Sequence, residues 1–143
     1  MSTRCRIGYV REDGKIESIY CHHDGYPREP GVGWVLKNHY TNIEDIKTLM
    51  SLGDISSLGN KPVSNPNAWE HPNFNPLIGD YAEWYKQNHP DDMCDTYASR
   101  GEDVPSEISE TKESYKELTA DCDGEYCYLF KDGKWHELFH SRM

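Results

Sequence analysis

Two Asp-Gly pairs constrain the fold of this chain more than any other feature of its sequence. Asp13-Gly14 separates the strand-like runs "RCRIGYV" and "KIESIYC", and Asp132-Gly133 separates "EYCYLF" from "KWHELF". An Asp-Gly pair between such runs is typical of a two-residue hairpin turn, because both turn residues must adopt a positive φ. The sequence therefore predicts two β-hairpins, one in each half of the chain.

The first predicted turn places particular residues opposite each other. If Glu12 pairs with Lys15 across a two-residue turn, the register of the two strands follows from the turn. Cys5 then lies opposite His22, and Ile7 lies on the same face of the hairpin. We expect this face to point into the core of the protein.

The second predicted turn sets a register in the same way. Phe130 is expected opposite Trp135, and Tyr126 is expected opposite Phe139. Both faces of these two strands carry apolar side chains. We therefore expect the strands of the second hairpin to lie well inside the β-sheet.

Between the hairpins the apolar pattern changes to a helical period. Apolar residues at i, i+3 and i+4 predict a short helix over residues 32–39. A second helix is expected to begin at a capping box formed by Thr41 and Glu44 and to end at Gly53. Residues 54–60 are predicted to form a turn or a single helical turn.

A long loop divides the chain at residues 60–78, which contain four prolines and five asparagines. A short helix after it carries Tyr81, Trp84 and Tyr85, which could form part of the core or a binding surface for a partner. A strand in "MCDTYASRG" and a helix in "SETKESYKEL" follow. The sum is an α+β fold over one domain, residues 1–143, with an antiparallel or mixed sheet and short helices packed on it.

Acidic residues concentrate in the second half of the chain. Residues 1–53 hold seven basic and seven acidic side chains, whereas residues 54–143 hold eight basic and eighteen acidic ones, for a net charge of −10. Such a surface repels nucleic acid and anionic lipid. We therefore expect no direct nucleic-acid binding and no membrane binding, and a basic protein surface is the natural complement.

The acidic strip, residues 102–125, holds nine carboxylates and two lysines. It is either an ordinary solvated surface or a strip that imitates nucleic-acid phosphates and occupies the basic channel of a nucleic-acid-binding protein. The carboxylates that we expect to contact such a partner are Glu102, Asp103, Glu107, Glu110, Glu113, Glu117, Asp121 and Asp123.

The segment "YCHHDGYP" at residues 20–27 groups residue types that bind metals. Successive strand residues point to opposite faces, so Cys21 and His23 share a face while His22 points away from them. No second Cys/His pair lies at a spacing typical of a structural zinc site. We expect no metal and no cofactor, and Asp24-Gly25 has the composition of a turn.

One candidate catalytic pair follows from the first predicted register. Cys5 and His22, opposite each other, could form a thiolate and imidazolium, the arrangement that activates a cysteine nucleophile. The expected position of this pair on the core face argues against it, because buried structural cysteines are commoner than reactive ones.

Several motifs spread over the chain carry a resemblance to a known family: "STR" (2–4), "SIYCHHDGYP" (18–27), "LGDISSLG" (52–59), "RGED" (100–103) and "YCYLFKDGKW" (126–135). In these motifs the chain resembles a family of small, acidic, mostly uncharacterised proteins of bacteriophages and prophages. The resemblance implies a phage-borne accessory protein that acts in the host cytoplasm. It implies no catalytic residues. By analogy, such proteins are often counter-defence factors of the anti-CRISPR or anti-restriction type.

Three hypotheses of function follow. The first is a protein without enzymatic activity that inhibits a host defence protein through the acidic strip, with the aromatic helix as an anchor. The second is a small enzyme, or a nucleotide-binding or small-molecule-binding protein, that uses Cys5, His22 and the "CHHDGY" segment. The third is a phage structural or assembly factor.

Overall fold

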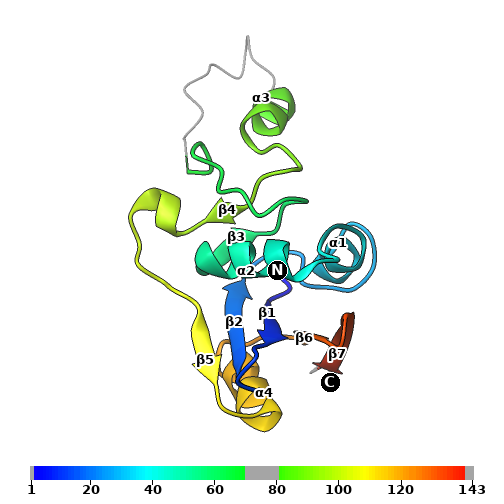
Figure 1. Cartoon of the computed structure of the whole chain (residues 1–143). Helices are drawn as coiled ribbons and strands as arrows, with labels where there is room; N and C mark the ends of the chain where they lie inside the picture. The colour runs from blue at the N-terminus through cyan, green and yellow to red at the C-terminus, as the bar shows by residue number, and fades with distance from the viewer. Residues whose placement is uncertain (1, 70–80, 141–143) are drawn as a thin grey trace.

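A computed structural model describes residues 2–69 and 81–140, in which seven strands form one mixed sheet (Figure 1). Four strands come from the two hairpins, and the other three are only two or three residues long. The strands are β1 (Cys5–Val10), β2 (Ile16–Cys21), β3 (Ile55–Ser57), β4 (Asp95–Thr96), β5 (Glu107–Ser109), β6 (Tyr126–Lys131) and β7 (Lys134–His140).

The strand order is β4-β3-β2-β1-β6-β7. β1 runs parallel to β6 and β2 runs parallel to β3, whereas the other pairs are antiparallel. β5 also pairs with β2, antiparallel and at the opposite end from β3. The α+β architecture with a mixed sheet, predicted from the hairpins and the helical periods, is confirmed.

Helices lie on both faces of the sheet. α1 (Val32–His39) and α2 (Ile43–Ser51) share the main core with one face, and α4 (Lys112–Asp121) packs on the other. α3 (Tyr81–Asn88) lies beyond β4, at the opposite end of the molecule from α4 (Figure 1). No helix in the described residues has both the length and the apolar surface that a bilayer crossing requires.

The alternation of side chains along β1 serves two cores. Cys5 and Ile7 point into the main core between the sheet and helices α1 and α2. Gly8 lies on the other face, under the ring of Tyr115 from α4, whose hydroxyl donates a hydrogen bond to the carbonyl of Tyr128 (2.5 Å). The smaller second core therefore forms around one buried tyrosine.

The first hairpin has a three-residue turn, so the predicted register is wrong by one residue. The Arg11 amide donates to the carbonyl of Lys15 (2.8 Å), and only Gly14 in the turn has a positive φ, 85°. The Asp13 carboxylate accepts a hydrogen bond from the Lys15 amide (3.1 Å), which favours this longer turn. As a result Cys5 pairs with Cys21, not with His22.

The second hairpin has the predicted two-residue turn, with positive φ at both Asp132 and Gly133, and Phe130 pairs with Trp135 as predicted. A β-bulge between Cys127 and Tyr128 then shifts the register. Position 126 therefore pairs with position 140, and the predicted pairing of Tyr126 with Phe139 is wrong.

The helices follow their predicted periods with local differences. Asn42 caps the N-terminus of α2, and its side chain accepts a hydrogen bond from the Asp45 amide (2.9 Å), so the predicted Thr41–Glu44 capping box is wrong. α2 ends near Gly53, as predicted, with φ +77° at that glycine. The predicted turn at residues 54–60 contains β3, and the segment before α4 contains β5.

We predict that Gly8→Ala lowers the free energy of unfolding by about 1–3 kcal/mol, the usual cost of overpacking a core. A Cβ atom at this position would lie 2.9 Å from the Tyr115 hydroxyl oxygen and 3.1 Å from the Glu17 carbonyl oxygen. Urea unfolding followed by tryptophan fluorescence measures the change. An unchanged midpoint would show that Tyr115 does not pack against β1 this closely.

Candidate functional site

The candidate catalytic pair does not form. Cys5 is fully buried, and burial raises the pKa of its thiol well above the ordinary value, with a further rise from the hydrogen bond to Cys21. His22 points to the other face of the sheet, where its Nδ1 lies 2.6 Å from the hydroxyl of Tyr20. Burial and the neighbouring His23 lower the pKa of His22. A thiolate nucleophile paired with an imidazolium has no support in this arrangement.

The "CHHDGY" segment forms a turn that leads from β2 into α1. Asp24 adopts a positive φ of 58°, and its carbonyl accepts a hydrogen bond from the Val32 amide (2.7 Å). The Gly25 amide donates to the carbonyl of Thr3 (2.8 Å). His23 and Asp24 are exposed at the surface, so part of this segment is available to a ligand.

All eight carboxylates predicted to contact a partner are exposed, but five of them form ion pairs within the chain. These pairs neutralise much of the acidic strip. They are Glu102 with Arg100, Glu107 with Arg6, Glu110 with Lys15, Glu113 with Lys116 and Asp123 with Arg4.

Glu107 has a structural role, because it faces a buried cation. The Arg6 side chain is 2% exposed; its Nε donates to Ser18 Oγ (3.0 Å) and its Nη2 donates to the Ser18 carbonyl (3.1 Å). Its Nη1 lies 3.6 Å from Glu107 Oε2. A buried guanidinium needs such partners, so Glu107 holds β5 against the sheet.

The outer face of α4 carries three exposed carboxylates at a spacing of four residues: Glu113, Glu117 and Asp121. This spacing aligns them along one side of the helix. No basic residue lies in the last turn, where a cation would interact favourably with the helix dipole. We call these three residues the α4 stripe.

The predicted aromatic helix contributes a surface, not a core. Tyr85 is 46% exposed, and its ring stacks on that of His89 with centroids 4.0 Å apart. Trp84 is half-buried, and the side chain of Tyr81 lies outside the described part of the structure. Because α3 and α4 lie at opposite ends of the molecule (Figure 1), a partner that contacts both the aromatic helix and α4 would span the molecule.

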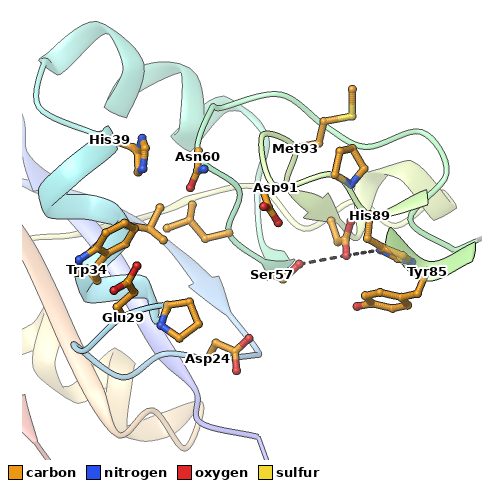
Figure 2. Close-up of a pocket in the computed structure, with 15 residues that line it drawn as sticks. Asp24, Glu29, Trp34, His39, Ser57, Asn60, Tyr85, His89, Asp91 and Met93 are labelled. Atoms are coloured by element: carbon orange, nitrogen blue, oxygen red, sulfur yellow. Dashed lines mark hydrogen bonds and ion pairs between the residues drawn. The ribbon is translucent and has the colours of Figure 1, made fainter. Parts of the chain in front are cut away.

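A concave site that the sequence did not reveal is a cavity of about 490 Å³ between α1 and residues 85–95 (Figure 2). A second cavity of about 340 Å³ shares part of its lining and adds His23 and Trp69. The lining of the larger cavity includes four carboxylates, two aromatic rings and two histidines: Asp24, Glu29, Asp91, Asp95, Trp34, Tyr85, His39 and His89.

A polar network centred on Asp95 forms one wall of the cavity. Asp95 Oδ2 accepts hydrogen bonds from Ser57 Oγ (3.1 Å) and from Nδ1 of His89 (3.0 Å), while Oδ1 accepts one from Asn65 Nδ2 (3.0 Å). Asn65 is 1% exposed and also donates to the carbonyl of Asn88 (2.7 Å). One carboxylate therefore connects β3, the Asn/Pro-rich loop and the end of α3.

The comparisons with known proteins do not identify a family. No family model, no curated protein and no solved structure matches this chain. Within the described ranges, no group of three or more His, Cys, Asp or Glu side chains is placed to share a metal ion.

We predict that Asp95→Ala loosens this part of the molecule locally, because the buried Asn65 amide loses an acceptor, at a cost of about 1–3 kcal/mol. Amide hydrogen exchange should rise in residues 60–69 and 81–94 and stay slow in β1. Asp92→Ala, at an exposed neighbouring position, is the control. Equal exchange in the two variants would contradict a structural role of the network.

The effect of Asp54 on stability should depend on pH. Its carboxylate accepts a hydrogen bond from the Tyr20 amide (2.9 Å), but burial outweighs this bond and raises the pKa of Asp54 above 3.8. Folding therefore favours the protonated form, and the stability that it contributes at low pH is lost as the pH rises through the folded-state pKa.

We therefore predict that Asp54→Asn, which keeps the hydrogen-bond acceptor without the charge, stabilises the protein more at pH 7 than at pH 3.5. Urea unfolding of the variant and the parent at both pH values measures the difference. Asp92→Asn at an exposed position serves as the control. A gain that is the same at both pH values would contradict the proposed effect of burial on Asp54.

Proposed function

We propose that this protein is a binding protein, without enzymatic activity, that inhibits a nucleic-acid-handling defence protein in the cytoplasm of a bacterial host. It would do so by direct contact with the partner's basic surface, in the manner of an anti-CRISPR or anti-restriction factor. The α4 stripe is the observation that carries this proposal.

The α4 stripe is unfavourable for the isolated chain. Glu113 and Glu117 repel each other at i, i+4, as do Glu117 and Asp121, and each such pair costs about 0.2–0.5 kcal/mol. Asp121 also lies at the negative end of the helix dipole. Glu113 pairs with Lys116, but Glu117 and Asp121 form no ion pair among the described residues. Where a sequence breaks a local rule without such a compensating contact, a functional role is the usual reason.

A basic partner would remove this cost. Exposed carboxylates at regular intervals present negative charge in the way a phosphate backbone does, and a groove that binds nucleic acid attracts both. The net charge of −10 speeds the approach to such a groove and disfavours direct binding of nucleic acid. The phage origin and the anti-defence role rest on the resemblance of the motifs and on analogy.

We predict that Glu117→Lys uncouples binding from stability. The change replaces two repulsive pairs on α4 by attractive ones, so the free energy of unfolding should rise by about 1 kcal/mol. Affinity for a basic partner should fall about tenfold or more, because like charges then meet in the interface. Glu12→Lys, at an exposed position in the first hairpin turn, changes the net charge equally and is the matched control.

The measurement is affinity purification of the tagged variants from bacteria that carry defined defence systems, at two salt concentrations, followed by urea unfolding of the purified proteins. The parent and Glu12→Lys should retain a nucleic-acid-binding protein at low salt and lose it at higher salt. Equal retention by Glu117→Lys, or a complex that salt does not weaken, would argue against the α4 stripe as the binding surface.

A further inference from the structure

The larger cavity has two walls that come from distant parts of the sequence. Figure 2 shows Asp24, Glu29 and Trp34 on one side, from the turn before α1 and from α1 itself, and Tyr85 and His89 on the other. The Asp95 network holds the second wall in place through Ser57 of β3. The cavity is therefore a built feature of the fold and does not depend on a single loop.

The charge of the lining has one sign. Four carboxylates and no lysine or arginine are among the lining residues that the structure describes. Three of the carboxylates, Asp24, Glu29 and Asp91, are exposed, whereas Asp95 is buried in its hydrogen-bond network. Carboxylates gathered around a concave site concentrate negative potential there, which attracts a cation.

The aromatic side chains narrow the class of cation. Trp34 and Tyr85 line opposite walls, and aromatic faces attract a guanidinium more often than an ammonium. A guanidinium is planar and presents five donors that suit several carboxylates at once, whereas an ammonium is compact and strongly hydrated. The combination of flat rings and several carboxylates therefore favours an arginine side chain.

The chain itself contains an arginine in this kind of environment beside the second cavity. The guanidinium carbon of Arg100 lies 4.2 Å from the ring centroid of Trp69 and 5.1 Å from that of Tyr97. Its Nε forms an ion pair with Glu102. Two aromatic rings and a carboxylate thus hold the guanidinium of Arg100. One of these rings, Trp69, also lines the smaller cavity.

We infer that the larger cavity receives an arginine side chain from the partner protein. This inference rests on the proposed function and adds a second contact at the other end of the molecule from the α4 stripe. Trp34, which lies beside Glu29 in Figure 2, would stack on the guanidinium plane, and Glu29 and Asp91 would accept its hydrogen bonds. The exposed positions of both carboxylates make them removable without loss of fold.

The test uses the isolated full-length protein and needs no partner. The blocked tripeptide acetyl-Gly-Arg-Gly-amide is titrated while the Trp34 indole and Tyr85 amide signals are followed by NMR. The same tripeptide with citrulline, the neutral isostere of arginine, is the ligand control. The arginine peptide should give saturable shifts at these two positions, and the citrulline peptide should bind at least about tenfold more weakly, a difference of about 1.4 kcal/mol.

Two double variants locate the binding. Glu29→Gln with Asp91→Asn should weaken the arginine peptide about tenfold or more. Glu12→Gln with Asp132→Asn removes the same charge from exposed positions in the two hairpin turns, outside the cavity lining, and should leave peptide binding unchanged. Equal binding of the citrulline peptide, equal loss in both double variants, or an absence of saturable shifts would overturn the inference.

Free arginine distinguishes a protein side chain from a small molecule. Its α-carboxylate is repelled by the acidic lining, so it should bind more weakly than the blocked peptide. Tighter binding of free arginine would overturn the inference in favour of a small-molecule site. Because partner capture tests the α4 stripe separately, peptide binding without a captured partner would support the cavity site and count against the proposed function.

Discussion

The rest of this structure depends on the alternation of side chains along β1. This strand lies between β2 and β6, so both of its edges are paired, and helices pack on both of its faces. Cys5 and Ile7 serve the main core under α1 and α2, while Arg6 and Gly8 lie on the face that α4 covers. With few aliphatic residues available, the protein builds its second core on a glycine and a tyrosine, and places a buried cation beside them.

Arg6 explains why the acidic strip is not a uniform binding surface. A guanidinium withdrawn from water needs hydrogen-bond partners and an opposite charge, and Ser18 and Glu107 supply them. A count of carboxylates treats Glu107 like Glu117, although the first holds β5 to the sheet and the second lies on the outer face of a helix. Only the geometry separates an acidic residue that maintains the fold from one that can meet a partner.

The sequence predicted the elements whose signals are local. The two hairpins and the helices that became α1, α2 and α4 follow from turn residues and apolar periods. The register predicted for the first hairpin is wrong because the Asp13 side chain accepts a hydrogen bond from the Lys15 amide. The Asp-Gly pair alone does not reveal this contact. β3 and β5 are too short to show a pattern, and the Asp95 network joins distant residues that no spacing relates.

The Asp95 carboxylate also gives the Asn/Pro-rich loop a thermodynamic connection to the cavity. The same side chain lines the cavity and accepts the hydrogen bond from Asn65, which orders the first part of that loop. A ligand that binds only when this wall is formed stabilises the wall. By thermodynamic linkage, forming the wall raises the affinity for the ligand by the same free energy. A change at Asn65, which is not among the residues that line the cavity, would thus tune affinity through the fraction of molecules in which the wall is formed.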